Sequence, residues 1–304
     1  MSDQLKVILW CCPRSLSTAF LKCMSAVPDS QMIFELYSTA MLFGPDRLAK
    51  TDIASLERNI PENILDERRK DPGCGYPVSI CSNAWVKHHL ETGYPDKKFV
   101  FAKEMVSSLM GKFQFLPESG YRHAFLLRNP AKLFPSWKKL IFEIFRMNNI
   151  PVTMEQLEID KLSAEIMPPG KAFKEMYDLY SYIKEKDLDP DPVIIDADDL
   201  LSDPATILSG FCQKLGIPYT DSLLTWDEAV DVLEKWVVSE PIKHIILNGD
   251  GFKNFRSSTG FAKPSSKDQA PESPAKSPDP SPDIQRLIDF TMPYYTKMYE
   301  QLLK

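Results

Sequence analysis

Short apolar runs alternate along this chain with longer stretches whose apolar residues follow helical spacing. The short runs predict strands at residues 5–12, 31–34, 98–102, 122–127 and 192–196. Apolar residues spaced by three and four predict helices that begin near residues 16, 130, 204 and 284. Because strands alternate with helices, we expect an α/β fold, a three-layer sandwich with a central, mostly parallel sheet.

A Pro- and Ser-rich segment interrupts this pattern near the end of the chain. Residues 262–283 contain no hydrophobic side chain larger than those of Ala and Pro. Such a segment buries too little apolar surface to offset its ordering entropy, so we expect a flexible loop. Residues 1–261 and 284–304 then form one α/β domain. Pro293 lies inside the last helical pattern, and we expect it to kink or split that helix.

Composition narrows the class of protein. The chain has 304 residues, 43% of them hydrophobic, and a formal net charge of −6. It lacks the basic field typical of nucleic-acid-binding proteins, and no run approaches the roughly 18 apolar residues of a membrane span. The six cysteines form no Cys-x-x-Cys pair. We therefore expect free thiols, no metal site, no nucleic-acid or membrane partner, no signal peptide and a cytoplasmic location.

One cation and three hydroxyls stand between the first strand and the first helix. They are Arg14, Ser15, Ser17 and Thr18. A helix N-terminus offers free N–H groups and a partial positive charge, so this turn is a candidate phosphate or sulfate site. The alternative is an ordinary strand-to-helix turn with a Ser N-cap. The turn has no glycine and no Lys-Ser/Thr pair, which disfavours a nucleoside triphosphatase of the Walker A type.

The segment 12–18, Cys-Pro-Arg-Ser-Leu-Ser-Thr, resembles the 5′-phosphosulfate-binding loop of sulfotransferases that use 3′-phosphoadenosine 5′-phosphosulfate (PAPS). That family usually has glycine where this chain has Leu16. The resemblance implies a P-loop-like sulfotransferase architecture. It assigns these residues to the phosphosulfate: Pro13, Arg14, Ser15, Leu16, Ser17 and Thr18.

Three later segments resemble the same family in the same order. In residues 125–137, Arg128 ends a strand and Ser136 follows on the next helix, as in the family's 3′-phosphate motif. Residues 196–218 resemble its strand-loop-helix segment, in which we expect the acids to close the helix entry. Residues 257–261 resemble a late loop that closes over the cofactor and implies contacts from Ser258, Thr259, Gly260 and Phe261.

The resemblance also implies the chemistry. Arg14 would neutralise charge on the leaving 5′-phosphate, and Lys103 stands where the family often has a cation near the sulfuryl group. The His that one branch uses as the general base is absent, since Met105 occupies its place. Glu35, which follows the second strand, is the predicted base and Glu104 the alternative. An ordinary helix-entry carboxylate remains the other interpretation of Glu35.

The predicted function is transfer of the sulfuryl group from PAPS to a hydroxyl or amine of a small molecule, releasing 3′,5′-diphosphoadenosine (PAP). Two alternatives stay open. One is a P-loop-type nucleotide kinase or hydrolase. The other is a non-catalytic nucleotide-binding adaptor that uses segment 262–283 as a tether. The sequence leaves open the identity of the acceptor and the oligomeric state.

Overall fold

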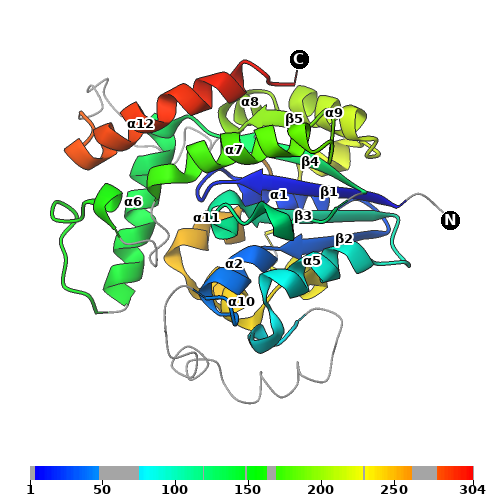
Figure 1. The fold of residues 1–304 in the computed structure, drawn as a ribbon, viewed down its shortest axis with the longest axis horizontal. Helices are drawn as coiled ribbons and strands as arrows, with labels where there is room; N and C mark the ends of the chain where they lie inside the picture. Colours follow the sequence, from blue (N-terminus) through cyan, green and yellow to red (C-terminus); the bar gives the residue numbers. More distant parts are fainter. Residues whose placement is uncertain are drawn as a thin grey trace.

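Six parallel strands form the sheet at the centre of the molecule (Figure 1). The computed structural model describes residues 4–47, 75–118, 120–147, 149–162, 169–228, 230–261 and 279–303. The strands run in the order β5-β4-β1-β3-β2-β6, and every pairing between them is parallel. Their bounds are β1 Leu5–Cys11, β2 Ser30–Phe34, β3 Phe99–Met105, β4 Tyr121–Leu127, β5 Val193–Asp196 and β6 Trp236–Val237. The predicted parallel sheet is confirmed.

Helices cover both faces of the sheet, which confirms the three-layer α/β fold. One face packs against α2 (Leu36–Leu42), α5 (Asn83–Thr92), α6 (Pro130–Met147), α7 (Ala172–Glu185) and α12 (Pro282–Tyr299). The other packs against α1 (Ser17–Met24), α8 (Ala197–Ser202), α9 (Pro204–Leu215), α10 (Glu240–Asn248) and α11 (Lys253–Ser257). Short 3₁₀ turns are Val78–Ile80, Val106–Leu109, Phe113–Phe115, Ile159–Lys161, Pro169–Lys171, Asp221–Leu224, Asp231–Lys235 and Asp250–Phe252.

Each face of the sheet has its own hydrophobic core, and alternate residues of the central strands pack into one core or the other. In β1, Ile8 and Trp10 join the core under α6 and α7, whereas Val7, Leu9 and Cys11 join the core under α1 and α9. All five side chains are fully buried. Burial on both faces explains why the sequence of β1 is an uninterrupted apolar run.

The sequence predicted that Pro293 would kink or split the last helix. Helix α12 is not split there but continues from Pro282 to Tyr299. Pro293 is exposed, so water can solvate the carbonyl that it leaves without a helical partner, and buried residues on either side hold the helix against α6 and α7. The helix begins two residues before the predicted position 284. Asp283 is buried there and pairs with Lys138 of α6 at 3.0 Å.

Residues 262–278 of the predicted loop lie outside the described residues. The strands β1 to β5 confirm the predicted apolar runs, whereas β6 was not predicted because two residues carry no pattern. As expected for an acid of this segment, Asp203 closes the entry of α9: its side chain accepts from the Thr206 amide, and Gly216 ends the helix at φ 76°.

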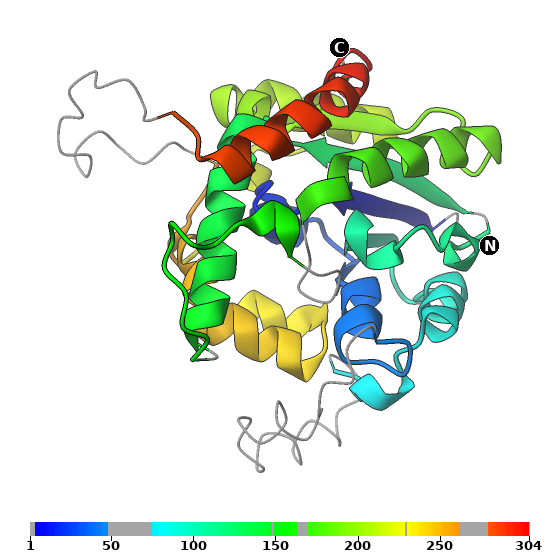
Figure 2. The ribbon, with the colours of Figure 1, turned by 60° about the vertical axis from the view of Figure 1, so that its left-hand side comes forward.

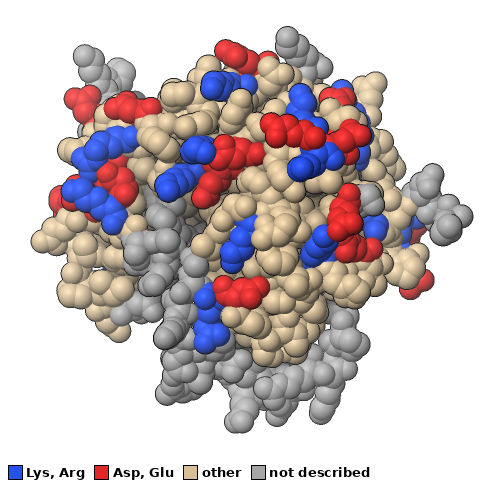
Figure 3. Space-filling model, in the orientation of Figure 1, with Lys and Arg blue, Asp and Glu red and all other residues tan. Residues whose placement is uncertain are grey.

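The carboxyl ends of the parallel strands meet at one edge of the sheet, which is where ligands bind in such folds. Seen toward this edge, α6 and the α10–α11 segment lie on either side of the turn after β1 (Figure 2). On the face drawn in Figure 3, acidic and basic side chains are interspersed, with no extended area of one sign. Across the described helices, none combines the length and apolarity needed to cross a membrane.

The cysteines that the structure describes are all buried free thiols, as predicted. In the same described ranges, no cluster of His, Cys, Asp and Glu has the composition of a metal site.

Candidate functional site

The turn between β1 and α1 has a left-handed backbone at two positions. Arg14 and Leu16 both have φ 69°, and Leu16 is the N-cap residue of α1. The Ser15 hydroxyl bridges the turn by donating to the Cys12 carbonyl at 2.8 Å. Leu16 thus adopts the conformation that glycine adopts most easily, at a cost of roughly 1–2 kcal/mol.

The electrostatic environment at the start of α1 would favour an anion. No side chain caps the helix, and its first turn contains no acidic residue. Ser17 is buried and Thr18 half-buried, so two hydroxyls accompany the first turn. The backbone N–H groups at this end carry the positive pole of the helix dipole.

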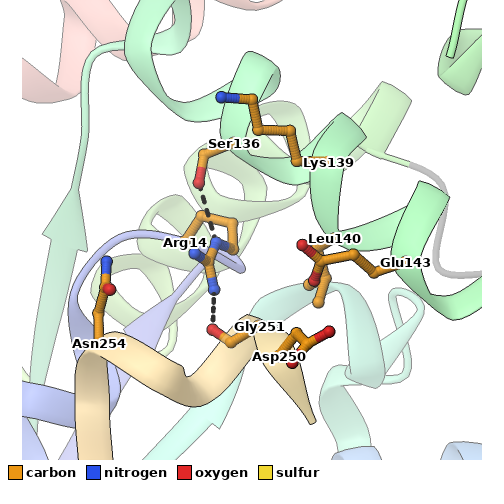
Figure 4. Close-up of a pocket in the computed structure, with 8 residues that line it drawn as sticks. All are labelled: Arg14, Ser136, Lys139, Leu140, Glu143, Asp250, Gly251 and Asn254. Atoms are coloured by element: carbon orange, nitrogen blue, oxygen red, sulfur yellow. Dashed lines mark hydrogen bonds between the residues drawn. The ribbon is translucent and has the colours of Figure 1, made fainter. Parts of the chain in front are cut away.

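Two arginines converge beside this turn. Arg128, which follows β4, donates from its guanidinium to the Arg14 carbonyl at 2.5 Å. The Arg14 guanidinium donates to Ser136 Oγ at 2.9 Å and to the Gly251 carbonyl at 2.6 Å (Figure 4). The Nε atom of Arg128 is buried without a hydrogen-bond partner. Two guanidinium groups and an unused buried donor therefore lie beside the turn.

The pKa of Arg14 is lowered from its usual value. Burial is the main cause, the positive charge of Arg128 adds to it, and the Glu143 carboxylate opposes it. A bound anion would offset the burial and the repulsion between the two guanidinium groups, because it would add a negative charge and further hydrogen-bond acceptors.

A small pocket of about 100 Å³ opens beside Arg14. It is lined by Arg14, Ser136, Lys139, Leu140, Glu143, Asp250, Gly251 and Asn254 (Figure 4). The four α6 residues lie on one helix face, since their spacing from Ser136 is three, four and seven. Gly251 allows the close approach: an added Cβ would lie 2.5 Å from Leu140 Cδ1.

The sequence analysis missed the α10–α11 side of this pocket. The only available signal was the run Asn248-Gly249-Asp250-Gly251, which is typical of a turn. The helical spacing from Ser136 could have suggested Glu143. Nothing local could show that the Gly251 carbonyl meets a residue 237 positions earlier.

A buried ion pair lies at the ends of β2 and β3. Lys103 is fully buried and Glu35 is 6% exposed, and the Lys103 ammonium donates to the Glu35 carboxylate. The Lys103 ammonium also lies 4.6 Å from the Phe34 ring centroid and 3.9 Å from Met105 Sδ. Burial alone would lower the pKa of Lys103, but the neighbouring anionic groups, Glu35 among them, raise it, so the amine stays charged.

Glu104, the alternative base, holds the start of α2. Its two carboxyl oxygens accept from the amides of Leu36 at 2.8 Å and Tyr37 at 3.1 Å. It is fully buried, and burial raises its pKa to about 8, with a smaller contribution from Glu35. Both of its oxygens are therefore occupied by the protein backbone.

The Ser258–Phe261 segment lies along α1 rather than against the two arginines. The Ser258 carbonyl accepts from Lys22 at 3.5 Å, and the Trp226 side chain donates to Ser258 Oγ at 3.2 Å. Phe261 is buried, with its ring 6.2 Å from that of Phe20 in α1. Thr259 is exposed. These contacts of the segment are with α1 and Trp226, so its role over a cofactor stays a prediction.

No protein-family model matches the chain. Two curated relatives from Arabidopsis thaliana align with it. They are branched-chain-amino-acid aminotransferase-like protein 2, 26% identical over 72% of this chain, and the corresponding protein 1, 24% identical over 84%. The matches cover 31% and 36% of those proteins, so the chain spans about a third of their length.

Among solved structures, the chain is similar to sulfotransferases. The sulfotransferase domain of the Synechococcus PCC 7002 olefin synthase aligns over 95% of each chain, with 16% identity and a TM-score of 0.48. The sulfotransferase domain of the curacin biosynthetic pathway aligns over 95% of this chain and 98% of its own, with 14% identity and a TM-score of 0.43. Mouse sulfotransferase SULT7A1, complexed with PAP, aligns over 73% of this chain and 61% of its own, with 15% identity and a TM-score of 0.37.

At these identities the similarity concerns the fold alone. The structure itself establishes the parallel α/β fold that the sequence pattern predicted, with Arg14, Arg128 and Ser136 gathered at the edge where the strands have their carboxyl ends.

Proposed function

We propose that this chain is a sulfotransferase that moves the sulfuryl group of PAPS to a hydroxyl or amine of a small molecule by in-line displacement. The observation that carries the proposal is the convergence of Arg14 and Arg128 beside the uncapped start of α1, with a buried Arg128 donor unused. An anion beside the two guanidinium groups would offset their repulsion and accept the unused hydrogen bond.

PAPS carries two separate anionic groups, and the site has two places for them. Residues 13–18 would bind the 5′-phosphosulfate through the backbone N–H groups and hydroxyls at the start of α1. Arg128 and Ser136 would bind the 3′-phosphate. Arg14 connects the two places, since its carbonyl meets Arg128 and its guanidinium meets Ser136.

When bound, PAPS supplies the sulfuryl group, whose bond to the 5′-phosphate oxygen breaks as the acceptor's bond to sulfur forms. In this scheme the α1 amides and Arg14 stabilise the charge left on the phosphate oxygen. The Lys103 ammonium, which has few other partners besides Glu35, would hold the sulfuryl oxygens. Glu35 would take the proton of the acceptor, a contribution of roughly 10²–10⁴-fold.

Glu35 suits the role of base better than Glu104. The Lys103 ammonium engages one Glu35 oxygen, Oε1, whereas backbone amides engage both oxygens of Glu104. We also propose that Ser258–Phe261 borders the cofactor from the α1 side, with Thr259 as its exposed member, and that the protein acts in the cytoplasm.

Thermal unfolding with PAP, with ATP and Mg²⁺, and with ADP tests the proposal. A ligand at 100 times its Kd that binds only the folded chain stabilises it by about 2.7 kcal/mol, which shifts Tm by several degrees. A shift with PAP but not with ATP and Mg²⁺, followed by consumption of PAPS in the presence of phenol and amine acceptors, supports the sulfotransferase.

The other outcomes favour the alternatives. A shift with ATP and Mg²⁺ instead favours a nucleotide kinase or hydrolase. Tight PAP binding without turnover on any acceptor favours a nucleotide-binding adaptor. Absence of any shift refutes the anion site.

A further inference from the structure

The direction of the Glu35 side chain does not follow from the strand that carries it. Successive residues of a strand face opposite sides of the sheet. In β2, Met32 and Phe34 pack into the core under α1, and Ile33 packs into the core under α2. By this alternation Glu35 should face the α2 side, where no ion pair with Lys103 could form.

A left-handed residue breaks the alternation. Glu35 has φ 53° and ψ 52°, and its amide donates to the Lys103 carbonyl at 2.9 Å, so it is still held to β3. Its side chain turns back toward the α1 side and pairs with Lys103, whose ammonium lies over the ring of Phe34. Such a conformation is costly for a residue other than glycine and persists only where its surroundings fix it.

Glu104 supplies that constraint from the opposite face. It follows Lys103 in β3, so the two side chains point to opposite sides of the sheet. Lys103 donates to the Glu35 carboxylate. Glu104 accepts from the amides of Leu36 and Tyr37, the two residues that follow Glu35. Two adjacent residues of β3 thereby hold the Glu35 side chain and the backbone that carries it.

We propose that Glu104 is the positioning residue for Glu35: its carboxylate fixes the backbone turn that directs Glu35 toward Lys103 and the reacting groups. The catalytic part of this inference rests on the proposed sulfotransferase function, whereas the structural part does not. Glu104 itself does not touch substrate.

The test compares Glu104→Gln with Asp189→Asn. Asp189 is a matched control, because it is also a buried carboxylate that accepts from two backbone amides, those of His123 and Asp191. Asp189 precedes β5, a strand that β4 and β1 separate from β3. Three quantities are measured: hydrogen exchange of the amides of Leu36 and Tyr37, PAP affinity, and turnover of PAPS with 4-nitrophenol as a model acceptor.

We expect Glu104→Gln to raise exchange at Leu36 and Tyr37 at least tenfold and to lower kcat at least tenfold, with the PAP Kd within twofold of wild type. Asp189→Asn should change none of these. The double variant Glu35→Gln/Glu104→Gln should be no slower than Glu35→Gln alone, because Glu104 acts only through Glu35.

Wild-type exchange at Leu36 and Tyr37 in Glu104→Gln overturns the proposal, as does an additive loss of kcat in the double variant. If Glu104→Gln does not fold, Glu104→Asp withdraws the carboxylate by one methylene and should give the same result. If neither variant folds, the wild type decides. Rapid exchange of the Leu36 and Tyr37 amides would overturn the proposal that Glu104 holds them, and protection of both amides would support it. A wild type that neither binds PAP nor consumes PAPS refutes the proposed function. The exchange measurement still decides whether Glu104 holds the backbone that follows Glu35.

Discussion

Replacing Arg128 by Met separates its role in binding from any role in stability. The side chain is half-buried at the end of β4, and Met keeps most of its apolar length. The substitution removes the hydrogen bond to the Arg14 carbonyl, the positive charge beside Arg14 and the buried, unpartnered Nε. We expect the folded chain to tolerate this loss, whereas PAP binding should not.

The magnitudes follow from these contacts. A hydrogen bond from a charged donor contributes about 1.5–3 kcal/mol, and an unpaired buried polar atom costs about 1–3 kcal/mol. The like charge of Arg14 adds to the unfavourable side, so the free energy of unfolding should change by no more than about 1 kcal/mol. Binding of PAP loses charge-assisted contacts of about 1.5–3 kcal/mol, which corresponds to about 10- to 150-fold in Kd.

Calorimetric titration with PAP and urea unfolding without ligand measure the two effects. Arg122→Met is the control, since Arg122 lies near the amino end of the same strand and pairs with the buried carboxylate of Asp189 at 3.1 Å. That variant should lose about 1–3 kcal/mol of stability and keep its PAP affinity. An unchanged PAP Kd in Arg128→Met would refute the anion site, and a stability loss above about 3 kcal/mol would show that Arg128 is structural.

Three further predictions concern the rest of the site. Glu35→Gln should keep the PAP Kd and lower kcat by about 10²–10⁴-fold, and a fully active variant would remove Glu35 as the base. Gly251→Ala places a Cβ 2.5 Å from Leu140 Cδ1, so calorimetry should show several-fold weaker PAP binding, and urea unfolding should show a stability loss of about 1–3 kcal/mol. Gly170→Ala is the control, since its Cβ would lie 4.0 Å from Leu287. Equal behaviour of the two variants would contradict the prediction. Burial raises the pKa of Glu104 to about 8 from an ordinary 4.5, so between these values the folded chain binds a proton that the unfolded chain has released. Urea unfolding should therefore show stability falling by up to a few kcal/mol from pH 5 to 8, and a Glu104→Gln slope equal to that of wild type would refute this origin.

The strands and most helices could be predicted because their patterns are local. Five buried strands produce five apolar runs, and the caps of α9 follow from Asp203 and Gly216, whose effects reach only a few residues. Strand β6 has two residues and pairs with β2 through contacts some 200 positions apart, so no local pattern marks it. Pro293 shows the reverse case, in which tertiary packing overrides a correct local rule.

The candidate site was predictable in its residue types but not in its contacts. The sequence placed cations and hydroxyls after β1 and β4, since the polar residues there interrupt apolar patterns. It could not show that the Arg14 guanidinium donates to Ser136 and to the Gly251 carbonyl. It kept Glu104 as the alternative to Glu35, because the strand pattern does not show which groups each carboxylate meets.

Backbone strain links these two parts of the site. Arg14 and Leu16 after β1 and Glu35 after β2 are residues other than glycine with φ between 53° and 69°. Each such residue costs of the order of 1–3 kcal/mol, and all three lie at the carboxyl ends of their strands, the edge where parallel sheets bind ligands. The turn at Leu16 leaves the α1 amides uncapped, and the turn at Glu35 directs a carboxylate to Lys103. The packed sheet on both faces supplies the stability that lets the chain keep these strained turns, and the turns bring the proposed anion site and the proposed base to the same edge.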